Sequence, residues 1–70
     1  MERQPVMSSD LASVGYDLRT QTLEIEFVKG GVYQYDGVSV DVYERLVTAP
    51  SVGRYFHSTV RNAYPYRRVG

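Results

Sequence analysis

The sequence predicts an α+β fold, in which a three-stranded antiparallel β-meander is followed by two short α-helices packed on one face of the sheet. Two observations lead to this prediction. Apolar and polar residues alternate with a period of two in the first half of the chain, up to about Gly37. The second half has apolar residues at helical spacing behind two serines that can cap helices. With 70 residues, the chain has room for one domain and one small core. We expect a flexible N-terminus at residues 1–8 and a single domain at residues 9–68.

The clearest predicted strand covers residues 22–28. Apolar and charged side chains alternate along it, so Glu24 and Glu26 share one face. The opposite face is apolar and carries Leu23, Ile25 and Phe27. This pattern is typical of an antiparallel strand with one buried face, and we expect the two glutamates to face solvent.

A strand at residues 11–16 is expected to pair with it across a polar turn. Counting back over that turn places Tyr16 opposite Leu23 and Val14 opposite Ile25. This register adds three residues to the apolar face of the sheet: Ala12, Val14 and Tyr16.

The third strand, at residues 32–37, returns after a turn that contains two consecutive glycines. Two registers are open. A two-residue turn sends Tyr33 and Tyr35 to the face of the glutamates, where solvent reaches them. A three-residue turn with a glycine bulge pairs Phe27 with Tyr33 and Ile25 with Tyr35, which joins both rings to the apolar face. We favour the second register because it keeps the polar residues of this strand out of the core.

Two helices are expected to cover the apolar face of the sheet. Ser39 can cap a first helix that runs to about Ala49. Pro50 then breaks the chain, and Ser51 can cap a second helix at residues 52–62. The first helix has an apolar stripe made of Val42, Tyr43, Leu46 and Val47.

The second helix separates apolar from polar residues. Its apolar side carries Val52, Tyr55, Phe56 and Val60, and its polar side carries Arg54, His57, Ser58 and Arg61. We therefore favour core positions for Tyr55 and Phe56 over base-stacking positions. Pro65 ends the helix, and the tail at residues 66–69 is either an extended arm or an added edge strand.

Charge is divided unevenly along this chain of zero net charge. Up to Glu44 there are eight acidic and three basic residues, and after it there are five basic residues and no acidic one. Arginines and aromatic rings are interleaved in the basic segment, a composition that suits phosphate contact and base stacking. The candidate residues for contact with a nucleic acid or a partner are Arg54, His57, Arg61, Tyr64, Tyr66, Arg67 and Arg68.

Several other functional classes have no support in the sequence. The absence of cysteine excludes disulfides, thiolate metal sites and a thiol nucleophile. The first fifteen residues contain three charges and no apolar run, so we expect neither a signal peptide nor a membrane span, and a cytoplasmic location. A histidine beside a serine, as at His57 and Ser58, is far more often a solvated pair than a catalytic one. No spacing supports a metal site or a phosphate loop. We therefore expect no enzyme, no cofactor, no small-molecule substrate and no contact with a membrane.

Several short runs together resemble the KTSC domain. The most distinctive are Tyr33-Gln34-Tyr35 and the run from Ser51 to Phe56, and the similarity extends over residues 5–68. KTSC domains are small bacterial and phage modules that also occur at the C-terminus of some lysyl-tRNA synthetases. The resemblance suggests RNA binding and implies no catalytic or cofactor residue. The chain departs from the family at Ser39, where proline is common, and at His57, where asparagine is common, which argues against a special role for this histidine.

Two hypotheses on function follow. A protein-interaction or self-associating module would set the acidic segment of one molecule against the basic segment of another protein or of a second copy. A module for tRNA or single-stranded RNA would place arginines on phosphates and stack Tyr64 or Tyr66 on an unpaired base. Zero net charge speaks against the second hypothesis, as does the face of Glu24 and Glu26, which would repel an RNA backbone. The simplest alternative is that the two segments neutralise each other within one molecule.

Overall fold

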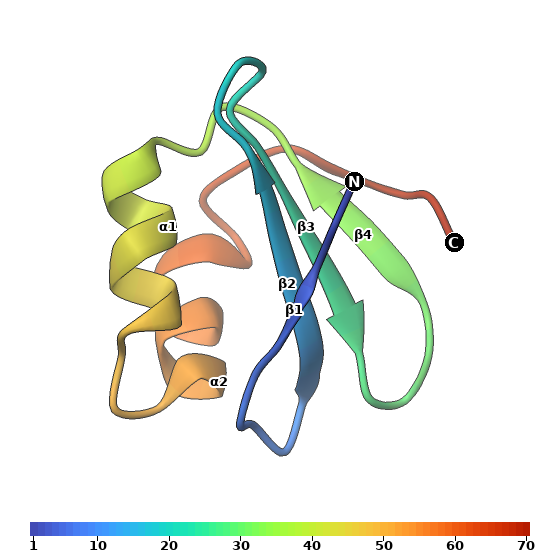
Figure 1. Cartoon of the computed structure of the whole chain (residues 1–70), viewed down its shortest axis with the longest axis vertical. Helices are drawn as coiled ribbons and strands as arrows, with labels where there is room; N and C mark the ends of the chain where they lie inside the picture. Colours follow the sequence, from blue (N-terminus) through green and yellow to red (C-terminus); the bar gives the residue numbers. More distant parts are fainter.

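The computed structural model describes all 70 residues and contains one five-stranded sheet. Its strands are β1 (Gln4–Pro5), β2 (Leu11–Asp17), β3 (Thr22–Phe27), β4 (Val32–Tyr35) and β5 (Tyr66–Arg68). They are antiparallel throughout and lie in the order β1-β2-β3-β4-β5. Between β4 and β5 the chain forms the helices α1 (Val40–Val47) and α2 (Val52–Tyr55) and a π-helix, Phe56–Val60, which lie over one face of the sheet (Figure 1). The α+β class is confirmed, whereas the predicted three-stranded sheet is corrected to five strands.

The two additional strands form the edges of the sheet. They have only two and three residues, too few to show an alternation in the sequence. Of the two alternatives for the tail, an extended arm or an edge strand, the structure has the edge strand β5. Val69 N–H, directly after it, donates to the carbonyl of Val32 at 2.7 Å. β1 lies within the segment that we expected to be flexible, and there Gln4 pairs with Val14. The mobility of residues 1–8 stays a prediction.

The register between β2 and β3 agrees with the sequence analysis except at its start. Tyr16 lies opposite Leu23 and Val14 opposite Ile25. Between Leu11 and Ser13 the register shifts through a β-bulge. Because a bulge adds one residue to a strand, the alternation of inward and outward side chains is reversed on one side of it. Here the reversal affects the residues before Ser13. Leu11 is therefore fully buried, and the core position predicted for Ala12 is wrong, since Ala12 is only half-buried.

The β3–β4 hairpin places the rings of Tyr33 and Tyr35 on the apolar face, but by a different pairing from the predicted one. Ile25 lies opposite Tyr33 and Leu23 opposite Tyr35, a shift of two residues. The loop has the predicted three residues but begins one residue earlier, at Val28, because Phe27 N–H donates to the carbonyl of Gly31 and Gly30 N–H to that of Phe27, both at 3.0 Å. Both glycines have positive φ, 112° and 94°. A shift of two residues leaves each side chain on the same face. Tyr35 is consequently buried, with 4% of its surface exposed.

Serine caps begin both α-helices, as the sequence predicts. The side chain of Ser39 accepts a hydrogen bond from Val42 N–H, and that of Ser51 accepts one from Arg54 N–H. The predicted second helix is α-helical for only one turn, because Arg61 N–H bonds the carbonyl of Phe56, five residues earlier, at 3.0 Å. In an α-helix these two residues would lie about 140° apart. The wider π-turn brings them toward the same side.

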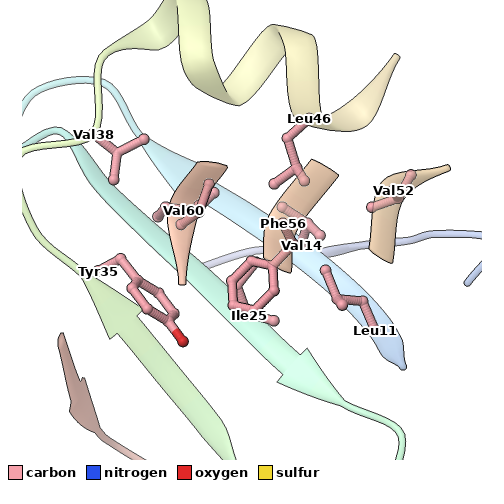
Figure 2. Packing of buried hydrophobic residues seen from close by; sticks show 10 residues of the cluster. Leu11, Val14, Ile25, Tyr35, Val38, Leu46, Val52, Phe56 and Val60 are labelled. Atoms are coloured by element: carbon pink, nitrogen blue, oxygen red, sulfur yellow. The ribbon is translucent and has the colours of Figure 1, made fainter. Parts of the chain in front are cut away.

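The hydrophobic core lies between the helices and the apolar sheet face. Figure 2 shows Leu46 reaching down from α1 toward Phe56, which lies close to Val14 and Ile25 of the sheet. The buried cluster consists of Leu11, Val14, Leu23, Ile25, Tyr35, Val38, Leu46, Val52, Phe56 and Val60. Phe56 holds a central place in this cluster, so the π-helix is anchored to the sheet by a large buried ring.

A hydrogen-bonded network covers the opposite face of the sheet. Glu24, at its centre, accepts hydrogen bonds from Arg3 and from Gln34, the latter at 2.8 Å. Ser13 accepts from Arg3 at 2.9 Å and donates to Glu26 at 2.8 Å. Glu24 is only 5% exposed, so the expectation that it faces solvent is wrong. The reason is that the N-terminal segment crosses β2, so that the side chain of Arg3 covers Glu24.

Glycine at position 15 makes that crossing possible. A β-carbon there would lie 2.6 Å from the carbonyl oxygen of Glu2, closer than such atoms can approach. Arg67 of β5 extends the network from the other edge, donating to Gln34 at 2.7 Å and to Asp36 at 2.6 Å. Polar bonds on this outer face therefore connect all parts of the sheet, from the N-terminal segment to β5.

A candidate aromatic binding cleft

An open cleft of about 570 Å³ lies on the helical side of the sheet, between the β3–β4 hairpin, the π-helix and β5. Its aromatic lining consists of Phe27, Tyr33, Tyr35, Phe56 and Tyr66, and we call this space the aromatic cleft. The alternation of β4 directs both tyrosines of that strand to this side, and the pairing of Tyr35 with Tyr66 brings in β5. The π-turn adds Phe56 and Arg61 from the helical side.

The rings that line the aromatic cleft differ in exposure, from fully buried to largely exposed. Phe56 is buried and meets Phe27 and Tyr35 edge to face, with ring centres 5.6 and 5.4 Å apart. Tyr35 in turn lies 5.5 Å from Tyr66, with 34° between the ring planes. Tyr66 is 60% exposed. A rigid floor therefore supports an accessible ring on which a flat ligand can stack.

The rim of the cleft is predominantly basic. Lys29, Arg61 and His57 line it, together with Asn62 and one acidic residue, Asp10. The carboxylate of Asp10 is already engaged, 2.9 Å from Nε2 of His57. The other ion pairs of the structure join Arg3 to Glu24 and Arg67 to Asp36, so Lys29 and Arg61 have no acidic partner. Both cations are exposed and free to meet an anionic ligand.

The phenol of Tyr35 stays protonated at neutral pH. Burial raises its pKa, and the neighbouring Tyr66 and Tyr33 add to this rise, while the positive charge of Arg61 opposes it. No fully buried side-chain nitrogen or oxygen in the structure lacks a hydrogen-bond partner. A neutral hydroxyl on the lining of the cleft can donate as well as accept a hydrogen bond.

The structure brings together three of the candidate residues named from the sequence. His57, Arg61 and Tyr66 line the aromatic cleft. Arg68 lies next to it, with its guanidinium carbon 5.9 Å from the centre of the Tyr33 ring. These four come from the π-helix, the turn after it and β5, so the returning chain, rather than one helix face, unites them.

The remaining candidates lie elsewhere. Arg54 is not part of the cleft lining but borders an adjoining polar groove with Ser8 and Ser51, which shares Asp10 and His57 with the cleft. Tyr64 is half-buried, packs against the core and does not line the cleft. Arg67 points to the opposite face of the sheet, where it bonds Asp36. The predicted continuous strip of basic and aromatic residues is therefore divided among three surfaces.

Two residues of the cleft have no signal in the sequence. Lys29 lies in the turn between the second and third predicted strands, and Asn62 is the last residue of the second predicted helix, so neither position indicates a binding role. The favoured register already put Tyr33 and Tyr35 on the helical side of the sheet. That register was the one signal in the sequence that pointed to an aromatic site there.

The comparison with known proteins agrees with this arrangement of strands and helices. A family model described as the KTSC domain matches residues 7–64. The chain belongs to the KTSC domain family. Its fold superimposes on the crystal structure of a KTSC domain protein from Yersinia pestis with a TM-score of 0.96, at 39% identity and covering 99% of this chain and 97% of that one.

Two curated relatives differ greatly in length. An uncharacterized protein of Stutzerimonas stutzeri is 40% identical over 70 residues, covering 99% of each chain. A lysine–tRNA ligase of Trichormus variabilis is 43% identical over 54 residues, which are 77% of this chain but 10% of the ligase. The KTSC unit therefore occurs both by itself and as a small part of a larger enzyme.

No helix reaches the length and apolar character needed to span a bilayer. No group of three histidine, aspartate or glutamate side chains gathers where it could hold a metal ion. The aromatic cleft, with its five rings and the unpaired cations Lys29 and Arg61, is the strongest candidate site for a ligand.

Proposed function

We propose that this KTSC domain is a binding module without catalytic activity that holds single-stranded RNA in the aromatic cleft. An unpaired base would stack on Tyr66, above the floor formed by Tyr35 and Phe56. The flanking phosphates would contact Lys29 and Arg61. Base stacking on an exposed ring contributes on the order of 1–3 kcal/mol and tolerates any base, so we expect little sequence preference.

The observation that carries this proposal is the separation of charge between the two faces of the sheet. Glu24 and Glu26 lie on the outer face, where Arg3 and Ser13 bond them. Lys29 and Arg61 lie at the cleft, on the other side, without acidic partners. An RNA strand in the cleft would therefore meet positive charge and be shielded from the glutamates, although the net charge of the chain is zero.

The relatives give independent support. The KTSC segment of the Trichormus variabilis protein is part of a lysine–tRNA ligase, an enzyme whose name states that it acts on tRNA. A small module that grips unpaired nucleotides would add affinity for that substrate. The same property would serve a chain in which the module stands alone.

Fluorescence anisotropy tests the proposal. We expect labelled single-stranded RNA and tRNA to bind at low salt, and Tyr66→Ala to weaken binding about tenfold or more through the lost stacking. Arg61→Ala should weaken it and reduce the salt dependence. With two phosphates contacted, log K should fall against log salt with a slope of roughly −1.4, and with one contacted, of roughly −0.7.

Arg54→Ala is the matched control, because it removes the same charge from an exposed position outside the cleft. If it weakens RNA binding as much as Arg61→Ala does, attraction to the basic segment is unspecific and the cleft is not the site. Absence of any binding at low salt would also refute the proposal.

A further inference from the structure

The free side of β5 carries backbone groups that the sheet does not use. Asp36 N–H donates to the carbonyl of Pro65, and Val69 N–H donates to that of Val32, so these two residue pairs are hydrogen-bonded pairs. In an antiparallel ladder, bonded and non-bonded pairs alternate. The register places Tyr66 opposite Tyr35 and Arg68 opposite Tyr33, which are then non-bonded pairs. The N–H and C=O groups of Tyr66 and Arg68 therefore point away from β4, toward solvent.

The side chains of β5 do not cover this edge. Charged residues commonly protect an edge strand by projecting over it. Here Arg67 instead folds back on β4 to bond Gln34 and Asp36. Arg68 lies over the ring of Tyr33, and its Nε donates to the carbonyl of Gly70 at 2.8 Å. The ring of Tyr66 likewise packs against Tyr33 and Tyr35, so all three side chains lean toward the sheet.

By contrast, the opposite edge of the sheet, formed by β1, is protected against pairing with another strand. β1 has two residues, and one of them is Pro5, which lacks an N–H group. β5 has a third residue and no proline within the strand. Only the β5 edge therefore offers two residues, spaced by two, whose donors and acceptors match those of an extended chain.

We propose that the β5 edge binds an extended acidic segment of a partner protein, which adds to the sheet as a sixth strand. The segment would exchange backbone hydrogen bonds with Tyr66 and Arg68. An acidic side chain beside Arg68 would pair with the one cation of this strand that no aspartate or glutamate side chain engages. This site is distinct from the RNA proposal, because its affinity comes from the backbone of β5 rather than from Lys29 and Arg61.

Charge favours such a partner over a second copy of this chain. Symmetric antiparallel pairing of two β5 strands through Tyr66 and Arg68 would place Arg67 directly opposite Arg67 of the second copy. Directly opposed like charges destabilise strand pairing, and the half-exposed ion pair of each Arg67 with Asp36 offsets this repulsion only in part. An acidic strand avoids this repulsion and gains attraction instead.

Amide hydrogen exchange followed by NMR tests the edge directly. In the free protein the amides of Tyr66 and Arg68 should exchange fast, while those of Arg67 and Val69 are protected. The probe is a labelled eight-residue peptide that alternates glutamate and valine. On binding it should protect the amides of Tyr66 and Arg68, and a peptide that alternates lysine and valine should bind at least tenfold more weakly.

Substitutions at position 68 separate the backbone from the side chain. Arg68→Pro removes an N–H that the sheet does not use, so the fold should persist and affinity for the acidic peptide should fall at least tenfold. Arg68→Ala keeps the N–H, and a loss of only a few-fold is expected. Arg61→Ala should leave peptide binding unchanged while it weakens RNA binding, so the two proposals can fail separately.

Three results would overturn the inference. The first is protection of the Tyr66 and Arg68 amides in the free monomer, which would mean that the edge is already closed. The second is protection that appears only as protein concentration rises, which would make a second copy the occupant. The third is protection of these amides by single-stranded RNA but not by the acidic peptide.

Discussion

The two faces of the sheet are built from the same alternating strands but differ in character. On the outer face, Glu24 is buried but hydrogen-bonded by Arg3 and Gln34, and the network leaves few groups free. On the inner face, the helices seal a core around Phe56, and the rings beyond that core stay open as the aromatic cleft. Saturated contacts are typical of a surface that stabilises a fold, and exposed rings with unpaired cations are typical of one that binds. This difference supports a stabilising role for the outer face and the core, and the proposed binding role for the cleft.

The largest expected effect comes from Phe56, which belongs to both the core and the cleft. Phe56→Ala should lower the free energy of unfolding by about 3–5 kcal/mol, because it leaves a cavity at the centre of the buried cluster. A core of this size supplies only about 3–5 kcal/mol, so the variant should be largely unfolded at 25 °C. Urea denaturation followed by circular dichroism measures this. The control Phe56→Leu should keep the fold, and a loss below about 1 kcal/mol for Phe56→Ala would contradict the central place of this ring.

A smaller effect is expected at the outer face. Glu24→Gln keeps the size of the side chain but removes the negative charge to which Arg3 and Gln34 donate hydrogen bonds. It should lower the free energy of unfolding by about 1–3 kcal/mol. RNA affinity should not change, because Glu24 lies on the face opposite the cleft. Glu26→Gln is the matched control, since Glu26 is less buried and accepts its side-chain hydrogen bond from the neutral Ser13.

The same carboxylate predicts the pH dependence of stability. Burial by itself would raise the pKa of Glu24, but the hydrogen bonds from Gln34 and Arg3, with the charge of Arg3, together hold that pKa below its ordinary value of 4.5. A lowered pKa in the folded state means that the contribution of Glu24 is complete above the pKa of the unfolded chain and is lost as pH falls through the lower, folded value. Denaturation curves between about pH 7 and pH 2 should show this loss in the parent protein, and Glu24→Gln should reduce it. An equal slope in both proteins would contradict the network.

The smallest effect on stability is expected from Arg67. Its ion pair with Asp36 is about half exposed on both sides, so Arg67→Ala should cost no more than about 1 kcal/mol. RNA affinity should be nearly unchanged, although the substitution removes one positive charge. Arg61→Ala should show the reverse pattern, with stability nearly unchanged and weaker binding. Equal loss of RNA affinity in both variants, measured by anisotropy beside denaturation, would break the distinction between the two faces.

Local patterns predicted the elements whose formation depends on near neighbours. The alternation around Ile25 gave β3 and its pairing with β2, and the serines at positions 39 and 51 gave the starts of both α-helices. Both kinds of signal act within a few residues of the chain. Part of the candidate site followed in the same way, since the face assigned to Tyr33 and Tyr35 was correct although their pairing was not.

Other features depend on contacts between distant segments. The bulge beside Leu11, the π-turn after Phe56 and the short strands β1 and β5 have no local pattern of their own. Arg67 and Arg68 are adjacent in the sequence, yet β5 directs one to Asp36 on the outer face and the other to Tyr33 beside the cleft. No property of two neighbouring arginines could indicate that difference before the strand was placed.

The sequence by itself determined the α+β class, the two-sided character of β3, the helix caps and the similarity to the KTSC domain. These depend on residue spacing and on backbone bonds between near neighbours. Only the tertiary structure decided that Arg3 covers Glu24, that Arg61 lies on the same side as Phe56 and that Tyr66 joins the rings of β4. The physical reason is that each of these depends on where a terminal segment or a helical turn packs, and packing against distant residues leaves no periodic trace in the chain.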